Sequence, residues 1–402
     1  MKYIVLVGDG MADYPVKELG ERTPLEAART PNLDYIARYG KLGRVKTIPE
    51  KMTPASDVAN ISILGYDPQK YYTGRGPLEA ANLGVDLEDD DVAFRCNLVT
   101  ASADILRDYS AGHISSKESE ILMRYIDEHL GTDRIKFYPG VSYRNLMLVK
   151  RGTDEHLQNL KCRAPHDIAG HSILKNLPKG EGAQIIIKLM EESRKILERH
   201  EINLVRVDLK ENPANMIWLW GQGKKPAMPA FADKYGLSGS VISAVDLIKG
   251  LGRIIGFEVI NVPGATGYYD TDYEGKAQAA IKTLEEKDFV LIHIEAPDEA
   301  GHNGDLREKI LAIERLDQLV LGAILKAFKR KKNFRLMVLP DHATPVTVKT
   351  HTPEPVLFGV FGKDIVARGF PSYSEKEAEK SDLYFEKGHE LMDYFIQGEK
   401  HA

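Results

Sequence analysis

Three short apolar runs, each leading straight into an aspartate, constrain the fold of this chain more than any other sequence feature. They are YIVLVGDGM at residues 3–11, FVLIHIEAPDEAGH at 289–302 and FRLMVLPDHATP at 334–345. Runs of this kind are typical of strands that are buried on both faces of a parallel sheet. Because the carboxyl ends of parallel strands meet at one edge, we expect the three aspartate-bearing loops to open onto that edge.

Helical patterns separate these runs. TPLEAARTPNLDYIARYG carries Leu33, Ile36 and Ala37 on one helix face, and the later stretches EGKAQAAIKTLEEK and REKILAIERLDQLVLGAILKAFK also have helical spacing. Alternating strands and helices predict an α/β fold whose mostly parallel sheet is sandwiched between helices.

The middle of the chain has a different composition. Residues 76–225 include the acidic stretch DLEDDD and two segments, GVSYRNLMLV and INLVRVDL, which we expect to form short strands. This mixture predicts an inserted α+β domain at 76–225. Residues 1–75 and 226–402 then form one discontinuous core.

Composition excludes several classes of protein. The 54 basic and 59 acidic residues give a formal net charge of −5, so the chain as a whole does not attract nucleic acid or anionic membranes. Cys96 and Cys162 are the only cysteines, which supports neither a disulfide scaffold nor a thiolate zinc site. The sequence shows no signal peptide and no apolar stretch of membrane-spanning length, so we expect a soluble, cytoplasmic protein.

Aspartates and histidines gather in the loops that follow the apolar runs. Asp298 and His302 are four residues apart, Asp341 precedes His342, His351 follows in KTHTPEP, and Asp9 ends the first run. Mixed carboxylate and imidazole ligands suit Mn²⁺, Zn²⁺ and related divalent ions. Any one of these motifs alone could be an ordinary loop feature. Their shared position after strands indicates a site for two metal ions.

Ser56 lies in TPASDVANISILGYD, where a helical pattern begins. One interpretation is that it caps the helix, since serine is a preferred N-cap residue. The other is that it is a nucleophile, because a helix N-terminus stabilises negative charge on an alkoxide and on a phosphate. A serine hydroxyl needs activation by a base or a metal ion, and a nearby divalent ion supplies it.

The motifs GDGM, TPASDVANISILGYDP, PDEAGH, LPDHATP and THTPEPV resemble, in this order, the alkaline-phosphatase superfamily. Within it, TPLEAARTPNLDYIARYG, YYTGRGPLEAANLGV and DYSAGHIS are similar to the archaeal-type cofactor-independent phosphoglycerate mutases. The resemblance covers most of the chain and implies an alkaline-phosphatase-like core with two divalent ions. It implies that Asp9, Ser56, Asp341 and His342 hold one ion, and that Asp298, His302 and His351 hold the other.

The same resemblance implies an activity. It is the interconversion of 3-phosphoglycerate and 2-phosphoglycerate in glycolysis and gluconeogenesis, with Ser56 transiently phosphorylated and without 2,3-bisphosphoglycerate as a cofactor. Mn²⁺ is the first choice of metal, with Mg²⁺, Co²⁺ and Zn²⁺ as alternatives. The expected partner is the small-molecule substrate, and the oligomeric state stays open.

The inserted segment carries the residues that the resemblance assigns to substrate binding. They are Asp108 and His113 in DYSAGHI, Arg144 in GVSYRNL, and His166 and Asp167 in APHDIAGH. An arginine suits bidentate binding of a carboxylate or a phosphate. Arg144 could equally be a surface charge on a strand, and His166 and Asp167 could form a turn after Pro165.

Two other functions fit the same motifs. One is a metal-dependent phosphomonoesterase or phosphonate hydrolase, in which water takes the phosphoryl group. The other is a non-catalytic metal-dependent binding protein, against which the retained nucleophile argues. A sizeable insert that could hold the acceptor alcohol favours the mutase.

Overall fold

The computed structural model describes residues 1–331 and 333–398, and the chain divides into two compact units. The core unit consists of Met1–Tyr72 and Met228–Ala402, and the inserted unit consists of Thr73–Ala227. The sequence predicted boundaries after residues 75 and 225, close to these. The role of the inserted unit in binding substrate stays a prediction.

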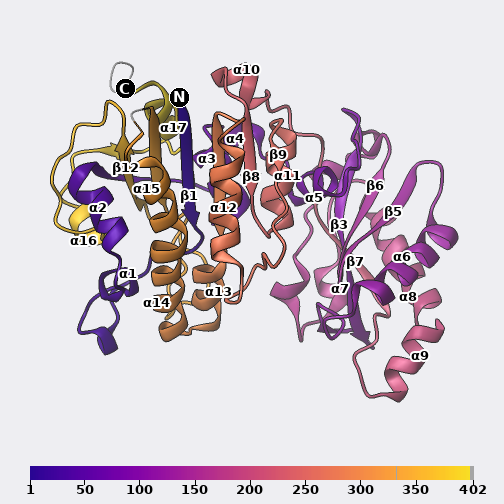
Figure 1. Cartoon of the computed structure of the whole chain (residues 1–402). Helices are drawn as coiled ribbons and strands as arrows, with labels where there is room; N and C mark the ends of the chain where they lie inside the picture. Colours follow the sequence, from indigo (N-terminus) through magenta and orange to yellow (C-terminus); the bar gives the residue numbers. More distant parts are fainter. Residues whose placement is uncertain (332, 399–402) are drawn as a thin grey trace. The chain divides into compact units, whose positions relative to one another are not determined.

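An eight-stranded sheet forms the centre of the core unit (Figure 1). In spatial order its strands are β13 (Tyr384–Phe385), β2 (Lys41–Val45), β12 (Val356–Gly362), β11 (Phe334–Leu339), β1 (Lys2–Gly8), β10 (Phe289–Ile294), β8 (Gly239–Ile242) and β9 (Glu258–Val259). The pairings from β11 to β9 are all parallel, whereas β12 runs antiparallel to both of its neighbours. The sheet is therefore mostly parallel, as predicted.

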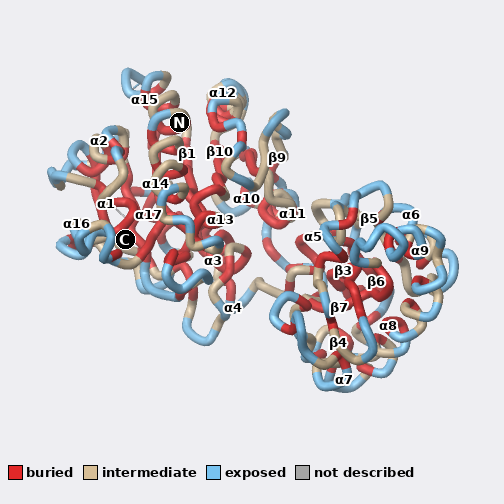
Figure 2. Tube along the Cα trace, turned by 90° about the horizontal axis from the view of Figure 1, so that it is seen from below, coloured by how far each residue is buried: buried red, intermediate tan, exposed pale blue. Residues whose placement is uncertain are grey.

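Helices cover both faces of this sheet (Figures 1 and 2). One face carries α2 (Pro31–Tyr39), α12 (Tyr273–Thr283), α14 (Leu306–Arg315) and α15 (Gly322–Phe328), and the other carries α3 (Ser56–Ile63), α11 (Asp246–Ile254) and α17 (Glu390–Gln397). Shorter helices are α1 (Pro24–Ala27), α4 (Pro68–Tyr71), α10 (Phe231–Tyr235), α13 (Ala296–Asn303) and α16 (Glu375–Ala378). The predicted α/β class is confirmed. Among the described residues, no helix is long and apolar enough to span a membrane.

The predicted helices of the core are present. Leu33, Ile36 and Ala37 are the buried residues of α2, as their spacing indicated. The stretch at 307–329, which reads as one helix in the sequence, is divided into α14 and α15 by a π-helical segment, Leu316–Leu321.

The strand register explains how distant residues meet. Gly8 of β1 lies opposite Ile294 of β10, and Val7 lies opposite Leu339 of β11. The loops that begin at Asp9, after β10 and after β11 therefore leave the sheet at the same edge, as expected for parallel neighbours.

The inserted unit is built on a five-stranded antiparallel sheet. Its strands are β3 (Val92–Ser102), β4 (Ile105–Asp108), β5 (Ile135–Val141), β6 (Arg144–Val149) and β7 (Met216–Gly223), and its helices are α5 (Arg75–Leu83), α6 (Ser116–Leu130), α7 (Ile173–Asn176), α8 (Ala183–Leu197) and α9 (Glu201–Asp208). β3 pairs with β4, β6 and β7, and the unit has its own apolar core around residues such as Phe94 and Trp218. The α+β character of this segment agrees with the prediction.

One predicted strand is wrong. INLVRVDL forms helix α9, although its β-branched residues favour a strand. The buried side chains of this helix are the polar Asn203 and Arg206, three residues apart. Both donate hydrogen bonds to carbonyl groups of neighbouring segments, including Ala214 for Asn203 and Ala111 for Arg206. These buried contacts stabilise the helix, while Leu204, Val205 and Val207 stay exposed.

A buried ion pair joins α14 to two of the loops that leave this edge of the sheet. Lys309 Nζ lies 2.6 Å from Asp13 Oδ2 and donates to the carbonyl oxygens of Ala12 and Thr344. Both side chains are fully buried. The pair therefore fixes the loop after β1 and the loop after β11 to the same helix.

We predict that Lys309→Met destabilises the protein by about 3–5 kcal/mol, because it leaves the Asp13 carboxylate buried without its partner. Lys380→Met, which removes a surface pair with Glu377, is the matched control and should cost about 1 kcal/mol or less. Urea unfolding of both variants measures the difference. Equal free energies of unfolding would contradict a stabilising role for the buried pair.

Candidate functional site

The loops at this edge of the core sheet place buried acidic side chains side by side. Asp9 follows β1, Asp298 lies in the first turn of α13 after β10, and Asp341 follows β11. Asp9 and Asp341 are fully buried and Asp298 is 3% exposed. Burial of several carboxylates at close range is costly unless positive charge accompanies them.

The first cluster surrounds the Nε2 atom of His342. Asp9 Oδ1 lies 3.4 Å from it, Asp341 Oδ2 lies 3.6 Å from it, and Ser56 Oγ lies 3.2 Å from it. The structure thus brings together the four residues that the family resemblance assigned to one ion.

The second cluster surrounds Asp298. Its Oδ2 lies 3.2 Å from His302 Nε2, and its Oδ1 lies 3.5 Å from His351 Nε2. The two histidine Nε2 atoms are 2.9 Å apart, so both point at the same small volume. These are the three residues assigned to the other ion.

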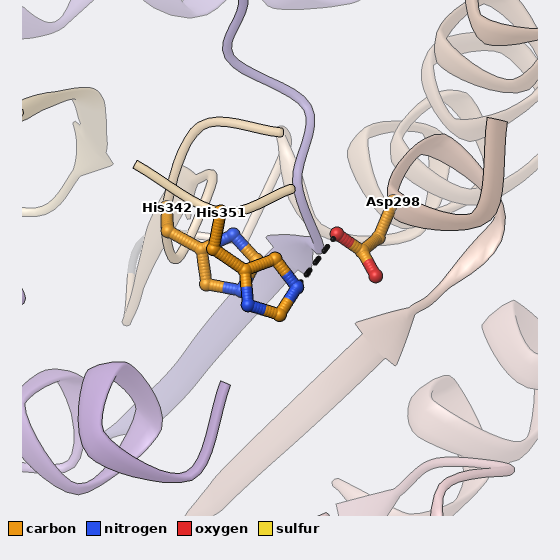
Figure 3. Close-up of side chains that lie close together, drawn as sticks. All are labelled: Asp298, His342 and His351. Atoms are coloured by element: carbon orange, nitrogen blue, oxygen red, sulfur yellow. Dashed lines mark ion pairs between the residues drawn. The ribbon is translucent and has the colours of Figure 1, made fainter. Parts of the chain in front are cut away.

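The two clusters adjoin one another. Asp298, His342 and His351 form a group whose ligand atoms lie within 4.8 Å of each other. Figure 3 shows the two imidazole rings side by side, facing Asp298 on its helix, and their centroids are 4.1 Å apart. An oxygen and nitrogen donor set without sulfur fits divalent ions of the Mn²⁺ and Zn²⁺ type.

Ser56 is the first residue of α3, and the N-cap is Ala55. The interpretation of Ser56 as the N-cap is therefore wrong. The N-cap position falls one residue earlier, and no side chain caps this helix. Ser56 has helical dihedrals, and its hydroxyl is directed to His342 rather than to the backbone of its own first turn. Its Oγ still lies at the positive end of the helix.

Several residues of the site were not predicted. His293 is fully buried in β10, with Nε2 at 3.1 Å from Asp9 Oδ2 and Nδ1 at 3.7 Å from Glu295. Its position inside an apolar strand gave no signal. Asn60 donates to Asp341 Oδ2 and to the carbonyl oxygen of Ser56, and its spacing of four from Ser56 could have indicated this.

Electrostatics at the edge reflect uncompensated negative charge. Burial, with Asp341 and Asp298 nearby, raises the pKa of Asp9 well above its usual range. Burial and the proximity of Asp9 raise the pKa of Glu295 in the same way. Among the described residues, the ion-pair contacts of the Asp9 oxygens are with His293 and His342, whose rings can be neutral. Bound cations would supply the missing charge, so the residues present fit a metal centre.

The pKa values of two histidines shift in opposite directions, because burial outweighs the nearby carboxylates at His342 but not at His302. Burial lowers the pKa of His342, which favours the neutral ring that a metal ligand requires. Burial also opposes protonation of His302, but Asp298 outweighs it and raises the pKa of His302 to about 9. Burial by itself would raise the pKa of Asp298, yet hydrogen bonds from His302 and His351 hold it well below its usual range.

Within the inserted unit, four of the predicted substrate residues lie along a row of rings. His113 and the Arg144 guanidinium both lie near the ring of Tyr143, at 6.1 and 5.8 Å. Tyr109 contacts Tyr143 on one side and His166 on the other. Asp167 lies 3.6 Å from His166.

The row continues to Trp220, whose ring is 5.4 Å from His166. The guanidinium groups of Arg75 and Arg95 lie over the same indole, at 5.6 and 5.2 Å. Sequence reasoning did not assign Arg95 to the site. At this end of the row Arg95 and Trp220 are buried, and Arg95 is paired with Glu79 at 3.1 Å. Arg144 is exposed, and its guanidinium is suited to binding a small anion.

Asp108 differs from the other four. Its Oδ1 accepts hydrogen bonds from the backbone and hydroxyl of Ser110, and its Oδ2 accepts from Gly112 and Asn212. Burial opposes ionisation, but these bonds lower the pKa of Asp108 overall. The carboxylate therefore stabilises the loop that leads to His113.

Comparison with known proteins identifies the family. Residues 37–203 match the family model described as 2,3-bisphosphoglycerate-independent phosphoglycerate mutase. The chain is 52% identical over 382 residues to a Methanosarcina acetivorans protein of that name, covering 95% of this chain and 96% of the relative. It is 50% identical to a Geobacter sulfurreducens protein named as a probable member, covering 98% of this chain and 100% of the relative.

Solved structures agree. A cofactor-independent phosphoglycerate mutase from Thermoplasma acidophilum is 28% identical with a TM-score of 0.68, covering 99% of both chains. A Pyrococcus horikoshii protein is 29% identical with a TM-score of 0.85, covering 100% of this chain and 98% of the other. The family that the sequence motifs indicated is confirmed, and the chain belongs to the 2,3-bisphosphoglycerate-independent phosphoglycerate mutases.

Proposed function

We propose that this chain interconverts 3-phosphoglycerate and 2-phosphoglycerate through a phosphoserine at Ser56. The observation that carries the proposal is the position of Ser56 Oγ, at the N-terminus of α3 and 3.2 Å from His342 Nε2 among buried carboxylates. A positive helix end next to a metal-type donor set is suited to an alkoxide and to a phosphoryl group.

Two divalent ions are part of this proposal, with Mn²⁺ as the first choice and Mg²⁺, Co²⁺ or Zn²⁺ as alternatives. Asp9, Ser56, Asp341 and His342 would hold one, and Asp298, His302 and His351 would hold the other. When bound, the ions supply activation of the serine hydroxyl and neutralisation of the phosphoryl charge.

The chain's own groups account for the remaining steps. Ser56 Oγ attacks the phosphorus of 3-phosphoglycerate and the bond to the 3-oxygen breaks. The proton lost by Ser56 is balanced by one taken up at the departing 3-oxygen, which leaves phosphoserine and glycerate. Glycerate reorients, and its 2-hydroxyl loses a proton and attacks the phosphorus. The bond to Ser56 Oγ breaks, and Oγ takes up a proton, which gives 2-phosphoglycerate and free Ser56. Arg144, His113, His166 and Asp167 would bind the glycerate, and Asp108 would stabilise the loop that leads to His113.

The proposal extends to the setting of the enzyme. A phosphoglycerate substrate and a glycolytic or gluconeogenic role fit a protein of the cytoplasm. The net charge of −5 and the local row of cations fit a small anionic partner rather than nucleic acid.

Product analysis tests the reaction. With 3-phosphoglycerate as substrate, we expect 2-phosphoglycerate to accumulate to equilibrium without release of inorganic phosphate. Release of phosphate as the main product would instead support the hydrolase alternative, and binding without turnover would support a binding protein.

We predict that Ser56→Ala folds normally but loses turnover by about 10³-fold or more, because the nucleophile is gone. Acid quenching with radiolabelled substrate should trap a phosphoenzyme in the wild type and none in the variant. Ser62→Ala is the control and should keep turnover. Ser62 lies on the same helix as Ser56, and its hydroxyl donates to the carbonyl oxygen of Thr47. An active Ser56→Ala enzyme would exclude the phosphoserine.

We predict that His351→Ala loses the ion held with Asp298 and His302 and retains the other, because the Nε2 atom of His351 contacts Asp298 and His302. Metal analysis of the purified protein after equilibration with Mn²⁺ measures the ratio of ions to chains. His129→Ala, in an exposed part of α6, is the control and should bind as the wild type does. Loss of both ions, or of neither, would contradict the two-cluster assignment.

We predict that binding of Mn²⁺ to the second cluster strengthens about tenfold per pH unit between pH 7 and 8.5, because His302 must lose its proton to become a ligand. The pKa of His302 is about 9 in the metal-free protein, so the protonated ring dominates below pH 9. Raising the pH towards 9 frees the ring nitrogen and strengthens metal binding. Titration calorimetry at several pH values measures the slope. A pH-independent affinity would show that His302 does not bind the ion.

A further inference from the structure

Thr344 lies between the two clusters and contacts a member of each. Its Oγ1 is 2.5 Å from Asp298 Oδ1 in the second cluster and 3.2 Å from His342 Nδ1 in the first. The residue is fully buried in the loop after β11. Neither the sequence motifs nor the proposed ligand sets give it a role.

The chemistry of a hydroxyl sets the direction of these bonds. A threonine hydroxyl has one proton to donate and lone pairs to accept, whereas an ionised carboxylate only accepts. Asp298, with a histidine nitrogen near each oxygen, is the acceptor, so the Thr344 proton points to it. The lone pair of Oγ1 is then left for His342, and His342 must carry its proton on Nδ1.

This assignment leaves His342 Nε2 with a free lone pair. Nε2 is the atom that faces Ser56 Oγ, Asp9 and Asp341. Only an unprotonated imidazole nitrogen can bind a metal ion or accept the serine proton. The hydroxyl of Thr344 therefore determines which ring nitrogen of His342 is available to the first cluster.

Close backbone packing holds the hydroxyl in place. A Cβ on Gly10 would lie 2.6 Å from Thr344 Oγ1 and 2.5 Å from Asp298 Oδ1, so only glycine fits there. A Cβ on Gly301 would lie 2.2 Å from the Thr344 carbonyl oxygen. Lys309 Nζ donates to that same carbonyl oxygen over 2.7 Å. The position of Thr344 is thus fixed by close packing against Gly10 and Gly301 and by the hydrogen bond from Lys309.

We propose that Thr344 is a positioning residue that sets the tautomer of His342 and couples the two clusters through one directed hydrogen-bond chain. The chain runs from His342 Nδ1–H to Thr344 Oγ1, and from Thr344 Oγ1–H to Asp298 Oδ1. This inference rests on the proposed function for its consequence in catalysis, but the tautomer and the metal affinity can be measured without any turnover.

Loss of the hydroxyl should affect both clusters. Without an acceptor at Nδ1, the His342 proton can move to Nε2, and Nε2–H then faces Asp9 Oδ1, a hydrogen-bond acceptor 3.4 Å away. Asp298 Oδ1 loses the hydrogen bond from the Thr344 hydroxyl that orients it within the second cluster. Removal of such supporting partners typically weakens metal affinity about 10–100-fold.

The test compares Thr344→Val, which keeps the shape without the hydroxyl, with Thr344→Ser, which keeps the hydroxyl. Calorimetric titration with Mn²⁺ should show both dissociation constants raised about 10–100-fold in Thr344→Val and nearly unchanged in Thr344→Ser. Thr100→Val removes a buried hydroxyl bonded to Pro213 in the inserted unit and controls for a general loss of stability. Wild-type affinity in Thr344→Val would overturn the proposal.

The tautomer is measured directly in metal-free protein labelled with ¹⁵N-histidine, using ring nitrogen–proton correlation spectra and His342→Gln for assignment. We expect the Nδ1–H form in the wild type and in Thr344→Ser, and an increased Nε2–H form in Thr344→Val. An Nε2–H tautomer in the wild type would overturn the proposal even if Thr344→Val did not fold. A wild type with the expected tautomer but no mutase activity would refute the proposed function and leave this inference standing.

Discussion

The parallel pairing of β11, β1 and β10 is the constraint on which the site depends. It brings the loops after the three strands to one edge and buries Asp9, Asp298 and Asp341 there. Like charges a few ångströms apart in a poorly solvated site repel by several kcal/mol even at an effective dielectric constant of about 20. The backbone ladder keeps the carboxylates together against this repulsion, so the edge attracts cations.

The chain tolerates the insertion because of the same arrangement. Asp9 and Ser56 precede the inserted unit and the other five proposed ligands follow it, yet all seven belong to the core unit. The core sheet is assembled from both ends of the chain, with β1 between β10 and β11. The inserted unit has its own sheet and apolar core, so its cations and rings can be arranged without altering the register of the metal-type site.

Sequence patterns predicted the parts of this site that sit at strand ends. Asp9, Asp298 and Asp341 were recognisable because each follows an apolar run in an alternating fold. His293 was not recognisable, because it lies within a continuous buried strand and nothing in the sequence pattern separates it from its apolar neighbours. The helix cap at Ser56 was off by one residue because backbone dihedrals, which the sequence does not give, decide where a helix begins. The α9 segment was misassigned since its buried face is polar, the reverse of the usual pattern.

A comparison of two aspartates after β1 indicates how the chain separates structure from chemistry. Asp13 and Asp9 are both buried, and both lie in the same loop region. Asp13 has the Lys309 amine at 2.6 Å, a counter-charge from the protein's own chain that makes Asp13 a fixed part of the fold. Among the described residues, the ion-pair partners of Asp9 are His293 and His342, which can be neutral. A lysine beside Asp9 would neutralise it and exclude other cations. Histidines leave its charge available, so that this aspartate can serve an exchangeable metal ion while its neighbour stabilises the loop.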